Sequence, residues 1–249
     1  MDETEKSRES EFFDHAYTTG SRKAVGRIYA ITRNRIRAYE KMIYGDVAGR
    51  KVLEYGCGTG SHSLEIARRG GEVVGIDISA VGIEKARARA AEAGVTGADY
   101  QVMDAEQMTF PADTFDLVIG EGILHHLSLE KSYAEIARVL KPTGRAVFME
   151  PLGHNLAINL FRRATPTMRT PDEHPLLRSD LKMVDRYFAA KHFEHYHLLS
   201  FGALLFLRTR MFYPVLNFLD AADRVLFKLL PPLKLTSWYT IMIMSKPRG

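Results

Sequence analysis

A glycine-rich turn is the feature that most constrains how this chain can fold. The apolar run Lys51–Tyr55 is followed by glycines at alternate positions 56, 58 and 60, and Ser61 then begins a helical pattern. Glycine is needed where φ is positive or where a ligand must approach the backbone closely, and a helix N-terminus presents unpaired N–H groups. The sequence KVLEYGCGTGS therefore predicts a strand, a tight turn and a helix, with a ligand at the turn.

A second apolar strand ends in a carboxylate. The segment Glu72–Ile78, EVVGIDI, carries Asp77 at its tip, 17 residues beyond Gly60 (77 − 60). A carboxylate there can accept hydrogen bonds from both hydroxyls of a ribose. A dinucleotide-binding fingerprint would read GxGxxG, whereas the pattern here is ExGxGxG, with Glu54 ahead of the first glycine. The spacing argues against a nicotinamide-dependent oxidoreductase.

Three further motifs follow in order, namely YQVMDAE at Tyr100–Glu106, FDLVIGEGILHHL at Phe115–Leu127 and LKPTG at Leu140–Gly144. Over roughly 51–151, the set resembles the class I S-adenosylmethionine-dependent methyltransferases and their small-molecule "type 11" group; Thr143 replaces a glycine of the last motif. The resemblance implies an enzyme that uses S-adenosylmethionine and releases S-adenosylhomocysteine. It also implies an α/β fold with a doubly wound, mostly parallel seven-stranded sheet in the order 3-2-1-4-5-7-6.

The resemblance implies which residues surround the cofactor. Glycines approach the cofactor, Asp77 holds the ribose, and the residues after the third and fourth strands meet the adenine edge and the methionine part. The expected cofactor-binding residues are Glu54, Gly56, Cys57, Gly58, Gly60, Asp77, Ile78, Asp104, Ala105, Glu106, Glu121, Gly122, His126 and Tyr17.

Composition narrows the class of protein. A chain of 249 residues that is 46% hydrophobic can bury one substantial core. The net charge of +4 comes from scattered basic residues, which does not indicate a nucleic-acid-binding surface. The N-terminus lacks the pattern of a secretory signal, and Cys57 is the single cysteine, so we expect a cytoplasmic protein. Charged residues interrupt the hydrophobic C-terminal third, which argues against a spanning helix.

The periodicities divide the chain into four parts. We expect a helical lid at residues 1–45 and the cofactor-binding core at residues 46–150. A proline-rich insertion at 151–180 is expected to cap the acceptor, and the rest of the core is expected at 181–249. In the lid, Phe13, His15 and Tyr17 either cover the cofactor or simply pack on the core. The last part predicts a helix at Leu181–Ala190, a strand at Phe193–Ser200, two apolar helices within 202–233 and an antiparallel strand at Ser237–Ser245.

Four residues are candidates for catalysis. His126, His125 and His154 suit a general base for a hydroxyl acceptor because histidine titrates near neutral pH, and Glu150 stands behind them. Transfer to an amine or an electron-rich carbon needs no enzymic base, so this role stays open. The histidines at 192, 195 and 197 lack a matched carboxylate or thiolate set, so we expect solvated strand residues and no metal site.

The acceptor is predicted from the apolar C-terminal helices and the insertion, which suit a small hydrophobic natural product, isoprenoid, quinone or lipid precursor methylated on O, C or N. The segment Gly120–Ile123 lacks the N/D/S-P-P-aromatic motif of DNA amino-methyltransferases, so no nucleic acid partner is expected.

The apolar C-terminal helices also suit a peripheral membrane contact, which Phe212→Asp would test, or a homo-oligomer face. A non-catalytic cofactor-binding or assembly protein remains the alternative. Arg162, Arg163 and Arg169 either bind an anionic acceptor group or are solvated.

Overall fold

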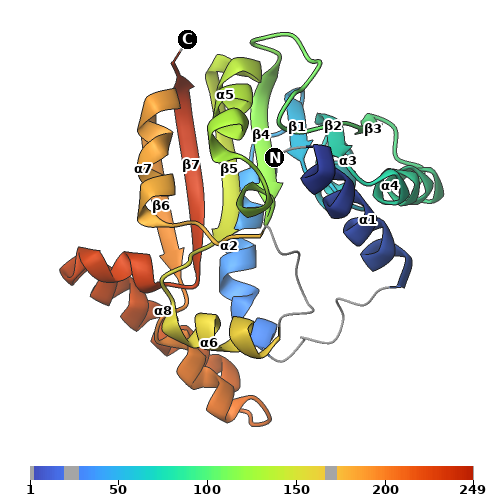
Figure 1. Ribbon diagram of the computed structural model, residues 1–249. Coiled ribbons are helices and arrows are strands. Elements are labelled where there is room, and N and C mark those ends of the chain that lie inside the picture. The colour runs from blue at the N-terminus through green and yellow to red at the C-terminus, as the bar shows by residue number, and fades with distance from the viewer. Residues whose placement is uncertain (1–2, 20–27, 166–172, 249) are drawn as a thin grey trace.

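The computed structural model describes residues 3–19, 28–165 and 173–248. Its centre is one seven-stranded sheet in the order β3-β2-β1-β4-β5-β7-β6 (Figure 1), as the family resemblance implies. Strand β7 runs antiparallel to both of its neighbours, and the other neighbouring pairs are parallel. The strands are β1 (Lys51–Tyr55), β2 (Glu72–Asp77), β3 (Ala98–Val102), β4 (Phe115–Glu121), β5 (Leu140–Pro151), β6 (Phe188–Tyr196) and β7 (Tyr239–Pro247).

Helices cover both faces of this sheet. The α-helices are α1 (Glu3–Thr19), α2 (Arg33–Tyr44), α3 (Ser61–Arg68), α4 (Ala80–Glu92), α5 (Leu129–Val139), α6 (Leu156–Ala164), α7 (Arg178–Tyr187) and α8 (Phe212–Leu229). Short 3-10 segments are η2 (Ile28–Thr32), η3 (Leu124–His126), η5 (Ser200–Phe206) and η6 (Pro231–Thr236). Helices α5 and α7 pack on one face, and α2 and α3 pack on the other.

The core explains why the inner strands are continuous apolar runs. Residues 52–55 of β1 are all buried, because both faces of a doubly wound sheet are covered. Tyr133 of α5 and Val184 of α7 are fully buried against one face, and Tyr39 of α2 and Ile66 of α3 against the other. This double cover fixes the strands, so that the loops at their carboxyl ends meet at one edge.

A third apolar cluster lies beyond the sheet and joins segments that are far apart in the sequence. Ile31 of η2, Ile158 of α6 and Leu216 of α8 pack together with Trp238. In Figure 1, α6 and α8 lie below the sheet, toward the end at which β4 and β6 terminate. The C-terminal helices therefore extend the end of the molecule at which the parallel strands finish.

The boundaries after the insertion differ from the prediction. Helix α7 begins at Arg178 and ends at Tyr187, three residues earlier at each end than expected, and β6 begins at Phe188 rather than Phe193. The run Ala189-Ala190-Lys191 has a helical propensity, but pairing with β7 overrides it from Phe188, which lies opposite Pro247. Strand β5 begins at Leu140, so it includes the LKPTG motif, and its register shifts against β4.

The expected pair of apolar helices is one α-helix between two 3-10 segments. Pro214 does not break α8, because it lies in the first turn, where a missing N–H costs nothing. Pro231 begins η6 instead of extending the helix. Within the described residues, none of the helices is both long enough and apolar enough to cross a membrane.

Candidate active site

The glycine turn after β1 is closed by backbone hydrogen bonds. The N–H groups of Gly56 and Cys57 both donate to the carbonyl oxygen of Ile76, at 2.9 and 2.8 Å. Gly56 has a φ of +76°, and a Cβ there would lie 2.7 Å from the side chain of Ile123. The absence of a side chain therefore lets the turn pack beneath the loop that follows β4.

Asp77, at the end of β2, binds the same turn. Its Oδ2 accepts a hydrogen bond from the Gly58 N–H at 2.8 Å, and its Oδ1 accepts one from the Ser79 N–H at 2.9 Å. Burial raises the pKa of Asp77 above its usual value, although these two N–H groups oppose the shift. The carboxylate is held rigidly at the rim of a cavity.

That cavity lies at the carboxyl ends of β1, β2 and β4, and residues of α1 form part of its lining. Nine of the fourteen predicted cofactor-binding residues line it, and these are Gly56, Asp77, Ile78, Asp104, Ala105, Glu121, Gly122, His126 and Tyr17. The remaining lining residues are Lys6, Glu9, Phe13, Ile76, Met103, Ile123 and Leu127. The sequence reasoning missed Lys6 and Glu9, because they lie in a polar helix whose sequence matches no motif of the core.

Five predicted cofactor-binding residues lie behind the lining. Glu54 is buried and accepts hydrogen bonds from the N–H and hydroxyl of Ser63, so it fixes the first turn of α3. Glu106 accepts the Ser128 N–H at 2.7 Å, which orients it toward the start of α5. The other three, Cys57, Gly58 and Gly60, form the turn itself; burial raises the pKa of the Cys57 thiol well above its usual value.

Glu121, at the end of β4, has a histidine partner that the sequence reasoning also missed. Its Oε2 lies 3.1 Å from His62 Nε2, and His62 Nδ1 lies 2.6 Å from the hydroxyl of Tyr44. Burial alone would lower the pKa of His62, but Glu121 and Glu54 outweigh it, so the pKa is raised. A sequence signal exists in retrospect, since His62 lies in the first turn of the helix after the glycine turn.

His125 and His126 follow β4 and differ in their environment. His126 lines the cavity, and its Nδ1 lies 2.5 Å from Glu9 Oε1. His125 Nδ1 lies 2.7 Å from Glu150 Oε2, on the side away from that lining. Burial lowers the pKa of His126 below its usual value, although Glu9 opposes the shift.

The other catalytic candidates are not at the cavity. Glu150 is fully buried, and besides His125 it accepts the N–H groups of Ile123 and Leu124, both at 2.9 Å. It therefore holds the loop after β4 and has no open side toward the cavity. His154 is exposed, and its Nε2 is 3.4 Å from the Arg178 N–H.

Several residues of the lid, the insertion and the edge strand depart from expectation. His15 is exposed, whereas Phe13 and Tyr17 line the cavity. Arg162 binds Glu173 at 2.7 Å, Arg163 is exposed, and Arg169 lies outside the described residues. Of the three histidines expected to be solvated, His192 is exposed and His195 is half-buried, but the prediction is wrong for His197, which is fully buried.

Comparison with known proteins places this geometry among methyltransferases. A family profile described as "Methyltransferase domain" matches residues 52–144. The aklanonic acid methyltransferase DauC of Streptomyces sp. (strain C5) is 32% identical over 181 residues, which cover 71% of this chain and 76% of that protein. A ubiquinone biosynthesis O-methyltransferase of Azoarcus sp. (strain BH72) is 38% identical over 117 residues, which cover 46% of this chain and 49% of that enzyme.

Solved structures share the fold. Phosphoethanolamine N-methyltransferase 2 of Haemonchus contortus, solved with phosphomonomethylethanolamine and S-adenosylhomocysteine, superposes with a TM-score of 0.68 at 19% identity and covers 96% of this chain and 60% of its own. Geranyl diphosphate C-methyltransferase of Streptomyces coelicolor A3(2), solved with Mg²⁺, geranyl diphosphate and S-adenosylhomocysteine, gives a TM-score of 0.61 at 16% identity, with 86% and 80% covered.

Proposed function

Because the chain belongs to the class I S-adenosylmethionine-dependent methyltransferases, we propose that it methylates a small, largely hydrophobic acceptor. Family membership gives the cofactor and the type of reaction. The acceptor class rests on two observations. By their names, two of the relatives and one structural neighbour act on aklanonic acid, in ubiquinone biosynthesis and on geranyl diphosphate. The part of the cavity lined by Phe13, Ile123 and Leu127 is itself apolar.

The cofactor would lie along the carboxyl edge of β1, β2 and β4. Asp77 already accepts two backbone N–H groups, and a carboxylate oxygen carries a further lone pair for a ribose hydroxyl. Ile78 and Met103 offer flat apolar contact for adenine, and Asp104 lies at the edge of the same space. Gly122 and Glu121 would border the methionine part, next to the turn at Gly56.

Methyl transfer from a sulfonium is a displacement in which the sulfur leaves without protonation. The main task of the protein is to hold the nucleophile, the methyl group and the sulfur in line while excluding water. Helix α1 supports this role, because Glu9, Phe13 and Tyr17 form one part of the cavity lining. For an oxygen acceptor, we assign proton uptake to His126, with Glu9 beside it in the cavity lining; carbon and nitrogen acceptors need no such base.

The single observation that carries the position of the cofactor is the hydrogen bond from the Gly58 N–H to Asp77, which sets the carboxylate beside the glycine turn. We expect S-adenosylmethionine and S-adenosylhomocysteine to bind in calorimetric titrations, and NADH not to bind. Asp77→Ala should weaken binding at least roughly tenfold, since hydrogen bonds to a charged group contribute about 1.5–3 kcal/mol. Asp116→Asn is the control, because Asp116 lies at the opposite end of the sheet and pairs with Lys141 at 2.8 Å. Binding of NADH alone would overturn the proposal.

Turnover separates the enzyme from the non-catalytic alternative. Incubation with methyl-labelled cofactor and a panel of quinones, phenols and isoprenoid alcohols should transfer label to one class. Strong cofactor binding without transfer to any acceptor would favour the cofactor-binding or assembly protein instead.

We also propose a peripheral membrane contact through one side of α8. Phe218, Val225 and Leu229 are 72%, 58% and 71% exposed, and their spacing puts them on one face of the helix. Such a face would give the enzyme access to an acceptor that is dissolved in lipid.

A further inference from the structure

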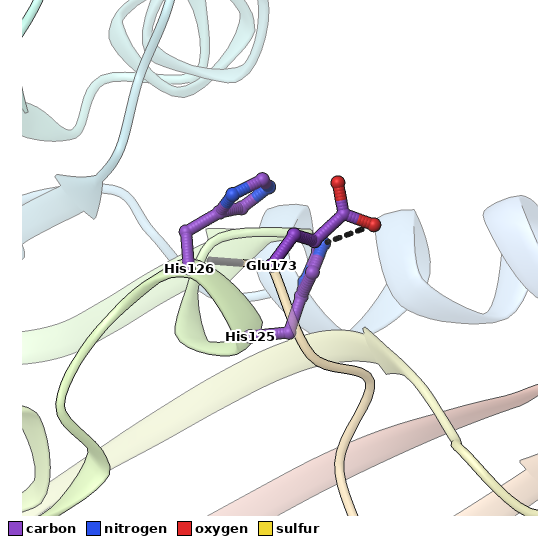
Figure 2. Close-up of side chains that lie close together, drawn as sticks. All are labelled: His125, His126 and Glu173. Atoms are coloured by element: carbon purple, nitrogen blue, oxygen red, sulfur yellow. Dashed lines mark ion pairs between the residues drawn. The ribbon is translucent and has the colours of Figure 1, made fainter. Parts of the chain in front are cut away.

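Two histidines and a glutamate converge beside the cavity, although the sequence places Glu173 far from the other two. His125 and His126 form the end of η3, and Glu173 lies in the segment that leads to α7. One ligand atom from each lies within 4.8 Å of the others. Figure 2 shows the three side chains directed into the same space, with the Glu173 carboxylate 3.9 Å from His125 Nε2.

Glu173 is held in this position by its neighbours. The N–H of His174 donates to the carbonyl oxygen of His125 at 3.0 Å, which ties the segment to η3. Arg162 Nη1 donates to Glu173 Oε1 at 2.7 Å. The cluster of His125, His126 and Glu173 therefore depends on three parts of the chain, which are η3, α6 and the segment before α7.

Each imidazole has a carboxylate on its Nδ1. Glu150 Oε2 lies 2.7 Å from His125 Nδ1, and Glu9 Oε1 lies 2.5 Å from His126 Nδ1. In the tautomer of His125 that donates from Nδ1 to Glu150, Nε2 keeps its lone pair, and metal-binding histidines show this arrangement in most proteins. The His125 ring can thus offer Nε2, which faces Glu173, to a cation, whereas the close contact of His126 Nδ1 with Glu9 does not have the geometry of a hydrogen bond.

The local charge balance favours a cation. The side chains of Glu9, Glu150 and Glu173 are only 6%, 0% and 7% exposed, and Arg162 pairs with one of them. Three carboxyl groups and one guanidinium thus lie around the two imidazoles. Buried charge of one sign is costly, and a bound divalent ion would offset it.

We propose that His125, His126 and Glu173 bind one divalent transition-metal ion, of the Zn²⁺, Co²⁺ or Mn²⁺ type. Two imidazole nitrogens and one carboxylate suit these ions, whereas Mg²⁺ prefers oxygen ligands alone. The ligand atoms are up to 4.8 Å apart. Because bonds to such an ion are about 2.0–2.2 Å long, these atoms must move closer to one another by roughly an ångström when the ion binds.

The site would bind an oxygen of the acceptor. Three protein ligands leave positions for an outside ligand, and His126 forms part of the cavity lining. The ion would hold a hydroxyl, enolate or carboxylate oxygen beside the methyl group, and His126 would then be a ligand rather than a general base. This role rests on the proposed function, whereas the metal site itself does not.

The test measures metal directly, in protein without a histidine tag. Titration with Co²⁺ should produce visible absorption bands, and elemental analysis after Zn²⁺ loading and dialysis should find about one ion per chain. Glu173→Gln, which keeps the shape of the side chain and the Arg162 contact, should weaken metal binding at least roughly tenfold. His192→Gln, at an exposed histidine of β6, should leave it unchanged.

Thermal melting and S-adenosylhomocysteine binding of the same samples show that the variants are folded. Wild-type protein that binds S-adenosylhomocysteine but no Co²⁺ or Zn²⁺ would overturn the metal site and leave the proposed function intact. Equal metal binding by wild type and Glu173→Gln would also overturn it. Metal binding by a protein that binds no S-adenosylhomocysteine would support the site and count against the proposed function.

Discussion

Lys6 Nζ lies 2.6 Å from Asp104 Oδ2, so that α1 is tied to the loop after β3 across the mouth of the cavity. Farther along α1, Asp14 accepts a hydrogen bond from the hydroxyl of Ser79, which follows β2. The hydrogen bond to Asp104 raises the pKa of Lys6, although burial opposes the shift. The polar residues of α1 thus attach to the ends of two different strands of the core.

Loss of the Lys6 contact should loosen the cavity. We expect Lys6→Met to speed dissociation of S-adenosylhomocysteine several-fold, as measured by stopped-flow fluorescence, because part-buried ion pairs contribute about 1 kcal/mol. Lys191→Met is the matched control, since Lys191 makes an ion pair of the same 2.6 Å length with Asp185, at the sheet edge. An unchanged dissociation rate in Lys6→Met would contradict a closing role for α1.

The glycine turn offers a matched pair of variants. Gly60 and Gly49 both have a φ of +71°, but a Cβ at Gly60 would lie 2.6 Å from the Tyr100 ring, and one at Gly49 has no neighbour within 4 Å. Both alanine variants carry the same backbone strain, and Gly60→Ala adds a clash. We expect urea unfolding to show an extra loss of roughly 1–3 kcal/mol in Gly60→Ala. Equal losses would mean that the ring moves aside freely.

His197 should make the protein sensitive to acid. Burial lowers the pKa of His197 to about 3, with Arg35 adding to the shift, and burial lowers that of His195 to about 4. Both pKa values lie below 6.5, the ordinary value for histidine. Between about pH 6.5 and the pKa values of the folded state, the unfolded chain therefore binds more protons than the folded protein. The free energy of unfolding falls as the pH falls through this range.

Replacement of His197 should weaken that dependence. His197 has a φ of +67°, which asparagine tolerates, so His197→Asn is the variant of choice. The slope of the unfolding free energy against pH, from urea titrations between about pH 6 and 4, should fall by up to roughly 1.4 kcal/mol per pH unit. The exposed His192→Asn should keep the wild-type slope, and an unchanged slope in His197→Asn would assign the acid sensitivity to other groups.

The membrane contact needs a different variant from the one that the sequence suggested. Phe212 is 5% exposed and packs with Leu216, so Phe212→Asp should unfold the C-terminal cluster, at a cost of roughly 3 kcal/mol or more. Phe218 is 72% exposed, and Phe218→Asp should leave the melting temperature nearly unchanged while abolishing co-sedimentation with anionic liposomes. Retained sedimentation of Phe218→Asp would remove the case for this face.

The sequence predicted much of the fold because its signals are local. Alternating strands and helices, the glycine turn and the carboxylate after β2 each depend on residues close together in the chain. The prediction failed at 188–190, where the expected helix gave way to pairing with β7, some fifty residues later. It also failed at His197, because the contacts of this residue with Trp238 and with Asp220 of α8 are not visible in a strand periodicity.

The sequence alone determined the family, the sheet order and the carboxylates that border the cavity, because these follow from short motifs at fixed spacing. Tertiary structure decided which side chains reach the cavity. It turned Glu150 and Glu106 into buried acceptors of backbone N–H groups, brought Lys6 and Glu9 to the lining, and set Glu173 beside His125. These relationships join segments 22 to 117 residues apart (128 − 106 and 126 − 9), and only the packed core fixes such distances.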